Sequence, residues 1–481
     1  MKIVAERIKT LFEKNNDASI HSIEKLPQSG SDRIYFRLET SKGSYISTYN
    51  QNVRENNTFF NFSSHFKKAN CPVANILHVN DEQTIYIQED FGDESLLTIL
   101  EREGPSPHVY ELFQQSLRQL ALLQINGHKN LDYKLCITSK EFGKQAILSD
   151  LLYFRYYFLD TLKIPYDKEK LIDDFEALST YLTRVEHKYF MFRDFQSRNI
   201  MIKDNKVNFI DYQGGMKGAL QYDVASLLWQ AKAELSDDWK NSLLDYYLDC
   251  AEEILKKPIN RARFITQYNG YVLIRLLQVL GAYGFRGLFE RKAHFLTSIP
   301  LALKNMRWFL QNKDTGIVLP EFERVLNLMV EEEIVNRFEP IQATASTPLI
   351  IQINSFSFRK GYPQDRTIHG GGFVFDCRGI LNPGRVAEYK SLNGRDKSVK
   401  DFLEQQTKMP EFLNNAYNLI DISVEEYILR NFSTLTINFG CTGGCHRSVY
   451  AADAVVRHLR NKYNVKIKLN HIEQNISESK G

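Results

Sequence analysis

The chain contains the stretch Phe192-Arg193-Asp194-Phe195-Gln196-Ser197-Arg198-Asn199, which is followed by Phe209-Ile210-Asp211. Asn199 stands five residues after Asp194, and Asp211 closes an apolar strand twelve residues after Asn199. A short hairpin between the two segments would bring two carboxylates and one amide together. The alternative is a polar surface loop between two strands. We favour the first interpretation, because the flanking segments also fit it.

Two carboxylates and an amide at this spacing suit phosphoryl transfer. That reaction needs little covalent chemistry from the protein. It needs one carboxylate that orients and deprotonates the acceptor hydroxyl, and two oxygen ligands that hold Mg²⁺ against a nucleoside triphosphate. The stretch therefore predicts a site that moves a phosphoryl group from ATP to an alcohol.

Length and composition set bounds on the protein class. A chain of 481 residues is too long for one ordinary core, so we expect at least two domains. A hydrophobic fraction of 43% and a charged fraction of 25% are typical of soluble globular proteins. We find no apolar run of the roughly 20 residues that a membrane span needs, and the charged N-terminus does not resemble a signal peptide. The scattered cysteines favour a reducing cytoplasm.

The first part of the chain predicts a small β-rich lobe followed by a large helical lobe. Helices are expected over 1–20 and 56–69. Strands are expected at 22–26, 33–38, 44–49, 76–79 and 84–89. Residues 106–310 have mostly helical periodicity, interrupted by a strand–loop–strand around 190–211. We expect an α+β, protein-kinase-like bilobal domain over 1–337, with its last helix at Glu321–Phe338.

The second part predicts a smaller domain of another kind. Residues 338–348 are small, polar and rich in proline, so we expect a linker there. Strands are expected at 349–354, 372–376 and 434–439, and helices at 398–413, 424–429 and 448–462. This alternation indicates an α/β domain over 349–481. That domain carries 18 Lys and Arg against 13 Asp and Glu, a balance of +5 that suits an anionic ligand.

Two segments of the small lobe are candidates for ATP contacts. Ser29, Gly30 and Ser31, followed by Arg33, form a turn of small residues whose backbone N–H groups could approach the phosphates. Gln88 and Asp90 lie in the segment that connects the lobes and would offer backbone groups to the adenine. An ordinary hairpin and a plain interdomain turn are the alternatives.

The hairpin Tyr189–Asp223 resembles the aminoglycoside phosphotransferase and choline kinase group of small-molecule kinases. Within that group it is most similar to the N-acetylmuramate/N-acetylglucosamine anomeric kinases, and the resemblance covers roughly residues 1–335. It implies that Asp194 is the general base, that Asn199 and Asp211 bind Mg²⁺, and that an amino sugar accepts the phosphoryl group. It also implies that Asp223 fastens the catalytic loop to its helix.

The chain departs from this family at two positions. Phe192 replaces a histidine whose role in the family is mainly structural. The strand Ser44–Tyr49 lacks the lysine that grips the phosphates. Arg33 and Arg37 are the candidates for its place, although each is equally well explained as a solvated strand residue. Without a replacement, the domain would be a pseudokinase that binds nucleotide without turnover.

Aromatic residues could stack on the sugar, although helical spacing favours a core position for most of them. They are Tyr153, Phe154, Tyr156, Tyr157 and Trp229.

A glycine-rich turn between a strand and a helix marks the second domain. Its backbone N–H groups and the helix dipole would converge on an anion, and an arginine would add a bidentate contact. The residues concerned are Cys441, Thr442, Gly443, Gly444, His446, Arg447 and Ser448. Tight packing by the glycines is the bland alternative. Five residues separate Cys441 from Arg447, as in cysteine phosphatases, so hydrolysis with Asp376 or Asp396 as the acid is a second possibility.

Several blocks between residues 352 and 470 together resemble the C-terminal domain of the RNase adapter protein RapZ. They are Ser355–Gly361, Phe375–Arg378 with Asn382-Pro383, Gly394–Lys397 and Gly440–Tyr450. This resemblance implies a site for glucosamine-6-phosphate, and RNA or protein partners. The ATPase domain of that family is absent here and the chain does not end in a basic tract, so we retain the sugar-phosphate ligand and give RNA less weight.

These observations predict a cytoplasmic, ATP- and Mg²⁺-dependent sugar kinase fused to a sugar-phosphate sensor, with no membrane partner. The alternatives are an RNA or protein adapter with a nucleotide-binding pseudokinase domain, and a phosphatase at Cys441–Arg447.

Overall fold

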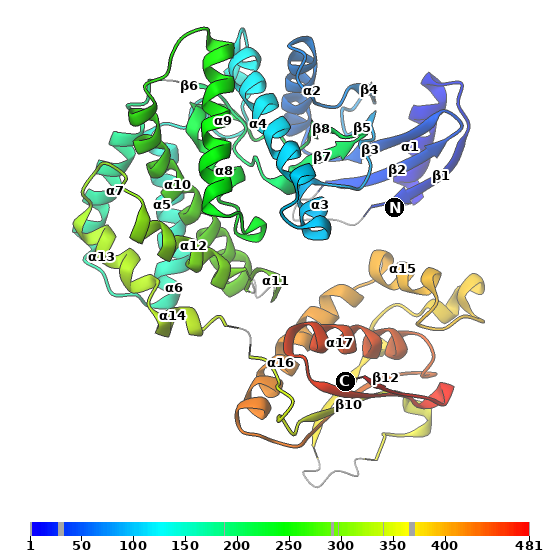
Figure 1. Ribbon diagram of the computed structural model, residues 1–481. Coiled ribbons are helices and arrows are strands. Elements are labelled where there is room, and N and C mark those ends of the chain that lie inside the picture. Colours follow the sequence, from blue (N-terminus) through cyan, green and yellow to red (C-terminus); the bar gives the residue numbers. More distant parts are fainter. Residues whose placement is uncertain are drawn as a thin grey trace. The chain divides into compact units, whose positions relative to one another are not determined.

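The computed structural model describes residues 2–26, 33–186, 188–289, 293–296, 298–339, 341–364 and 371–480. It divides into two compact units, Met1–Arg337 and Phe338–Gly481 (Figure 1).

The first unit begins with a five-stranded antiparallel sheet in the order β1-β2-β3-β5-β4. Its strands are β1 (Ile20–Lys25), β2 (Ile34–Thr40), β3 (Gly43–Tyr49), β4 (Ile76–Val79) and β5 (Ile85–Glu89). Two helices accompany this sheet, α1 (Lys2–Asn15) and α2 (Val53–Lys68). Alternate residues of β2, Phe36 and Leu38, are buried with Ile8 and Phe12 of α1 in one core, as the period of a strand requires.

The rest of the first unit is mainly helical. Its helices are α3 (Leu96–Glu103), α4 (Pro107–His128), α5 (Lys144–Phe154), α6 (Asp160–Leu162), α7 (Lys168–Leu182), α8 (Leu220–Leu228), α9 (Asp237–Leu255), α10 (Arg261–Tyr283), α11 (Ala293–Leu296), α12 (Ile299–Asn312), α13 (Pro320–Met329) and α14 (Glu332–Asn336). Local sequence fixes the start of helix α4. The side chain of Ser106 accepts a hydrogen bond from Val109 N, and Pro107 occupies the first turn.

Helix α10 is the centre of this helical lobe and packs against α5, α8 and α12. Together with the π-helical turn after it, it forms Arg261–Phe289, the one helix in the described ranges that is long and apolar enough to cross a membrane by length and composition. In the fold, 56% of its most apolar window is buried inside the protein. A core helix passes the same test of length and hydropathy, because burial against protein also selects apolar residues.

Two short hairpins carry the candidate phosphoryl-transfer residues. In one, β6 (Lys188–Met191) pairs with β9 (Met216–Ala219), and in the other β7 (Ile200–Lys203) pairs with β8 (Lys206–Phe209). The segment 192–199 leaves the end of β6 and enters β7, so the first hairpin fixes where this loop begins and the second fixes where it ends.

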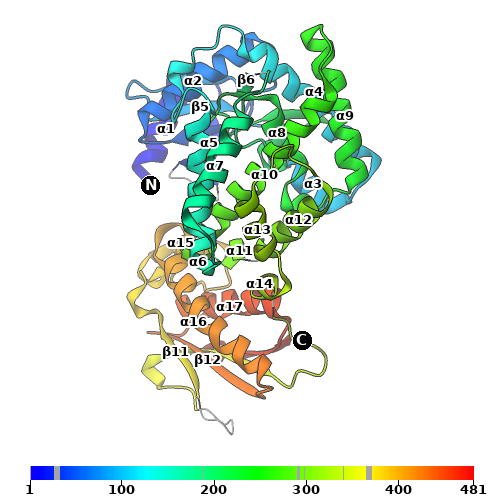
Figure 2. The same cartoon turned by 90° about the vertical axis from the view of Figure 1, so that its left-hand side faces the viewer.

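The second unit is built on a five-stranded mixed sheet in the order β11-β12-β10-β13-β14. Its strands are β10 (Ile350–Ser357), β11 (Gly372–Asp376), β12 (Thr434–Cys441), β13 (Lys466–His471) and β14 (Ile476–Lys480). All neighbouring strands are parallel except β13 and β14. The helices are α15 (Lys397–Gln406), α16 (Met409–Leu429) and α17 (Arg447–Tyr463), and α16 lies beside α17 (Figure 2).

The expected fold class, a kinase-like bilobal domain followed by a smaller α/β domain, is confirmed, with local differences. The helix expected over 1–20 ends at Asn15, and the one expected over 321–338 is divided into α13 and α14. The helices expected at 398–413 and 424–429 are instead α15 and a continuous α16. Strands β13 and β14 were not predicted, although Ile467 and Leu469 alternate with exposed lysines in β13.

Part of the segment expected to be a linker packs onto the second unit. Ala343 N donates to Tyr463 O at 2.8 Å, and Ala343 is buried in the same core as Ile351 and Leu435.

Replacing Ile353 by alanine should lower the free energy of unfolding of the second unit by about 2–5 kcal/mol, because Ile353 is fully buried in the central strand β10. Hydrogen exchange measured by mass spectrometry should rise in peptides of β10 and β12, while peptides of β2 and β3 remain unchanged. Lys468→Ala, at an exposed position of the neighbouring strand, is the matched control. Equal protection in wild type and Ile353→Ala would contradict the packing described.

Candidate functional site

The loop after β6 is held by the buried carboxylate of Asp223 on α8. Its oxygens accept hydrogen bonds from Phe192 N at 2.8 Å, from Arg193 N at 2.9 Å and from Gln124 Nε2 at 3.0 Å. Burial raises the pKa of Asp223 to about 6 in spite of these hydrogen bonds. The expectation that Asp223 fastens the catalytic loop is therefore confirmed.

Phe192, at the position of the family's histidine, is fully buried. Its ring contacts the rings of Phe195, Phe209 and Tyr212. An aromatic cluster thus supports the loop at this position.

Asp194 projects from this loop with about a third of its side chain exposed. Arg275 of α10 contacts Asp194 Oδ1 at 3.1 Å, and Arg198 contacts Oδ2 at 3.2 Å. Burial alone would raise the pKa of Asp194, but the charges of Arg275 and Arg198 and a hydrogen bond from Gln196 hold it below its ordinary value. Asp194 is thus ionised at neutral pH, as a general base must be.

The structure brings Asn199 and Asp211 close to Asp194. Asn199 Nδ2 donates to the backbone oxygen of Asp194 at 2.9 Å, and Ile210 N donates to Asn199 O at 3.1 Å. Asp211 follows Ile210 directly and has a positive φ of 70°, a strained conformation that turns it out of the strand direction. Because Asn199 donates through Nδ2, its Oδ1 is the atom left to face a cation.

Arg33 lies beside the carboxylate of Asp211. Its guanidinium contacts Asp211 Oδ1 at 2.9 Å and Glu55 of α2 at 3.4 Å, and only 14% of its side chain is exposed. Arg37 is placed differently, since it pairs with Asp90 at 2.7 Å and with Asp93 at 2.7 Å. Of the two arginines considered as substitutes for the family's lysine, Arg33 is therefore the one at the Asp211 carboxylate.

The other expected nucleotide contacts are only partly visible. Ser29, Gly30 and Ser31 lie outside the described residues. Asp90 uses its carboxylate internally, because it accepts from Arg37, from Ser44 Oγ at 2.5 Å and from Gly92 N at 2.8 Å. It also lines a cavity of about 330 Å³ with Lys67 and Lys203. Gln88 lies on β5 with Oε1 buried and without a hydrogen bond to the described residues.

Sequence reasoning missed Arg275. It lies 81 residues from Asp194, on a helix whose pattern indicates only a core element. The signal available was an arginine within the apolar run of α10, since a charged residue that becomes almost fully buried needs a partner.

In the second unit, the predicted anion loop joins β12 to the N-terminus of α17. Cys441 Sγ accepts hydrogen bonds from Gly444 N at 3.2 Å and pairs with Ser448 Oγ at 3.2 Å. Burial alone would raise the pKa of Cys441, but these hydrogen bonds and the charge of Arg447 bring it below its usual value. Gly444 has a φ of +70°, and a side chain there would strike Glu473.

Arg447 is only 4% exposed and anchors the same loop. Its guanidinium donates to the backbone oxygens of Ile380 at 2.7 Å and Arg378 at 3.1 Å, whereas its Nε is buried without a hydrogen bond to the described residues. His446 Nε2 contacts Tyr389 O at 3.0 Å. Next to Gly443 the space is open within 4 Å, so the turn leaves room for a ligand above the helix N-terminus.

The loop lies at the carboxyl edge of the parallel strands, where α/β sheets bind ligands. Ser357 and Cys441 end paired strands, and Asp376 ends the next strand. Asp376 is paired with Arg378 at 2.7 Å, and this hydrogen bond lowers its pKa. A general acid for phosphatase chemistry would need a raised pKa instead. Asp396 lies immediately before α15, and its carboxylate accepts a hydrogen bond from Asn393 N at 2.7 Å.

Comparison with known proteins supports these two assignments. Residues 22–256 match the model of the phosphotransferase enzyme family, and residues 349–475 match the RapZ C-terminal domain. By these matches, the chain combines a region similar to the phosphotransferase enzyme family with a region similar to the RapZ C-terminal domain.

The curated relatives that the chain resembles include several named as nucleotide-binding proteins. One from Fervidobacterium nodosum is 29% identical over 194 residues, which cover 39% of this chain and 67% of the relative. One from Ruminiclostridium cellulolyticum is 39% identical over 127 residues, which cover 26% of this chain and 42% of the relative. Among the relatives that match most strongly, the chain spans from 39% to 67% of their length.

Solved structures that resemble the chain include the choline kinase LicA from Streptococcus pneumoniae, with a TM-score of 0.42, 14% identity and coverage of 64% of this chain and 98% of that one. The amicoumacin kinase hAmiN in complex with AMP-PNP, Ca²⁺ and Ami has a TM-score of 0.47 and 12% identity, with coverage of 67% and 96%.

Replacing Arg275 by glutamine should move the acid limb of the pH–rate profile to higher pH. The substitution removes the charge that contributes most to lowering the pKa of Asp194, so burial dominates and the carboxylate protonates at a higher pH. Activity lost at low pH should return as the pH rises. The measurement is kcat/KM against pH for the wild type, Arg275→Gln and Arg263→Gln, an exposed position on the same helix. An unshifted acid limb in Arg275→Gln would contradict the role of this ion pair.

Proposed function

We propose that the first unit transfers the terminal phosphoryl group of ATP to a hydroxyl of an amino sugar. The observation that carries this proposal is the convergence of Asp194, Asn199 and Asp211, with Asp194 ionised and partly exposed. Phosphoryl transfer is catalysed by positioning and electrostatics, and this arrangement supplies both.

Asp194 would accept the proton of the acceptor hydroxyl. Asn199 Oδ1 and the Asp211 carboxylate are oxygen ligands of the kind that Mg²⁺ prefers, so the donor set fits that ion. When bound, Mg²⁺ offsets the negative charge of the ATP phosphates. Arg33 would contact the same phosphates in place of the family's lysine, and it reaches Asp211 from the small lobe.

The anomeric hydroxyl of N-acetylmuramate or N-acetylglucosamine is the acceptor we propose. Its support is the resemblance of the segments 193–201, 210–213 and 222–228 to the anomeric sugar kinases. The RapZ-like second unit supports it independently, because that family responds to an amino-sugar phosphate.

For the second unit we propose binding of a sugar phosphate by the loop Cys441–Ser448. The N-terminus of α17 offers unsatisfied N–H groups and a positive dipole to an anion. Arg447 Nε, which is buried without a hydrogen bond to the described residues, is a further donor. RNA or protein partners are a further proposal for this unit, supported only by the family match.

Hydrolysis at Cys441 is the second candidate, favoured by the lowered pKa of its thiol. The lowered pKa of Asp376 speaks against it, because the leaving group would lack an acid at that position.

The kinase proposal is tested by ATP consumption with a panel of amino sugars, followed by product analysis for a sugar 1-phosphate. Asp194→Asn should lower kcat by about 10²–10⁴-fold, the usual contribution of general base catalysis. Asp173→Asn, at an exposed position of α7, is the matched control and should keep full activity.

Activity of Asp194→Asn equal to wild type would refute the assignment of the base. ATP binding without turnover on any sugar would instead support the pseudokinase alternative.

For the second unit, calorimetry with glucosamine-6-phosphate on the full chain should show binding that Arg447→Lys weakens by about tenfold or more, since a hydrogen bond to a charged group contributes roughly 1.5–3 kcal/mol. Arg457→Lys, at an exposed position further along α17, should leave the affinity unchanged. Equal affinity in Arg447→Lys would exclude the loop as the site. Release of phosphate from the ligand that Cys441→Ser abolishes would assign a phosphatase instead.

A further inference from the structure

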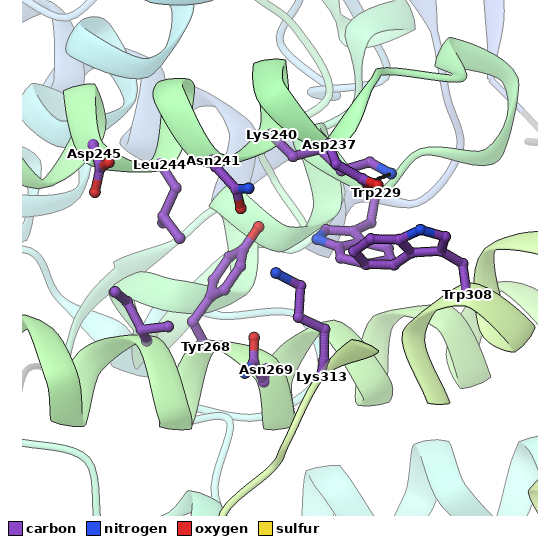
Figure 3. A pocket seen from close by; sticks show the side chains of 11 residues that line it. Trp229, Asp237, Lys240, Asn241, Leu244, Asp245, Tyr268, Asn269, Trp308 and Lys313 are labelled. Carbon is purple, nitrogen blue, oxygen red and sulfur yellow. Dashed lines mark hydrogen bonds and ion pairs between the residues drawn. The ribbon is translucent and has the colours of Figure 1, made fainter. Parts of the chain in front are cut away.

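A second cavity lies in the helical lobe, between α9, α10 and α12 (Figure 3). Its volume is about 230 Å³, which suits a small ligand. Asp194, Asn199 and Asp211 do not line it. The cavity is therefore separate from the phosphoryl-transfer residues, and the proposed kinase reaction gives it no role.

Two buried polar atoms of this cavity have no ordinary hydrogen-bond partner. Trp229 is 4% exposed and Tyr268 is 3% exposed. Trp229 Nε1 and the Tyr268 hydroxyl lie near enough to interact weakly with each other, but neither atom forms a hydrogen bond of ordinary geometry with the described residues. In Figure 3 the two atoms face each other, on the same side as the amino group of Lys313. An unsatisfied buried donor costs about 1–3 kcal/mol, so a ligand that accepts from these groups would remove that cost.

Two lysines give the cavity positive charge. Lys313 points into the centre (Figure 3) and has no ion pair among the residues that the structure describes. Lys240 lies over the ring of Trp229 at 4.4 Å and pairs with Asp237 at 3.4 Å. Burial lowers the pKa of Lys240, and the nearby charge of Lys313 lowers it further. An anion beside Lys313 would relieve this repulsion.

The walls suit a sugar ring. Trp229 and Trp308 lie with their ring centroids 5.6 Å apart. Trp229 is covered by this packing and by Lys240, whereas Trp308 is partly exposed and can offer apolar surface to C–H groups. Asn241, Asp245 and Asn269 also line the cavity and present oxygen atoms that can accept from hydroxyl groups. Asp237 and Asp245 add negative charge at the exposed side of the cavity. Because like charges repel, the acidic group of a bound sugar would lie at Lys313 and not at that side.

We propose that this cavity binds an anionic sugar, whose carboxylate or phosphate contacts Lys313, Trp229 Nε1 and the Tyr268 hydroxyl while its ring packs against Trp308. A short connection links this cavity to the loop that carries Asp194. Gln230, the residue after Trp229, accepts hydrogen bonds from Ser197 N at 2.9 Å and from Ser197 Oγ at 2.7 Å.

Tryptophan fluorescence reports on this site selectively. The chain has three tryptophans, all in the first unit, and Trp229 and Trp308 line the cavity whereas Trp239 does not. The second unit contains no tryptophan of its own. The full chain is titrated without ATP with N-acetylmuramate, which carries a carboxylate, with glucosamine-6-phosphate, and with neutral N-acetylglucosamine.

At least one of the two anions should change the fluorescence with saturation, and neutral N-acetylglucosamine should bind at least tenfold more weakly. The anion that binds identifies the acidic group as carboxylate or phosphate. Lys313→Gln should weaken that binding by about tenfold or more, the value of one charged hydrogen bond. Lys232→Gln, at an exposed position near the cavity, should leave it unchanged.

No saturable change with either anion would overturn the proposal. Saturation that is equal in the wild type and Lys313→Gln would also overturn it. The assay requires neither ATP nor Asp194, so its failure leaves the kinase proposal standing, and loss of turnover in Asp194→Asn leaves this one standing.

Discussion

The arrangement of the first unit depends on the buried carboxylate of Asp223. It accepts hydrogen bonds from two consecutive backbone N–H groups, those of Phe192 and Arg193, at the point where the chain leaves β6. Those donors would otherwise be buried without partners, which is costly in a low-dielectric interior. Gln124 connects the carboxylate to the Tyr247 hydroxyl, so the core of the helical lobe holds the loop that carries Asp194.

Arginines from both lobes balance the charge of Asp194 and Asp211, the two carboxylates proposed for phosphoryl transfer. Arg275, on a core helix, faces Asp194, and Arg33, beside the small sheet, faces Asp211. The pKa of Asp194 is therefore held low enough for it to stay ionised, and the two guanidinium groups add positive charge beside the two carboxylates. Since Arg33 bridges Glu55 and Asp211, the loss of the family's lysine does not leave the site without a cation.

The anion site that we propose for the second unit is built differently. Its loop uses backbone groups at a helix N-terminus and one buried arginine whose contacts are mostly with carbonyl oxygens. The edge of a parallel sheet collects the ends of β10, β11 and β12, so residues from distant segments meet there. The lowered pKa of Cys441 follows from the same donors that would serve a phosphate.

The sequence alone determined what is local: the alternation of the small-lobe strands, the loop spacing that sets Asp194 beside Asn199, and the glycine turn before α17. Tertiary structure decided the pairs. Arg275 is 81 residues from Asp194 and Arg33 is 178 residues from Asp211, and Trp229 meets Trp308 only because α12 folds back. Periodicity reports which face of an element is buried but not which element covers it, since that depends on the path of the whole chain. Strand β13 was missed for the same reason. Its apolar residues alternate with lysines in the sequence, but only the folded structure shows that this segment pairs with β10.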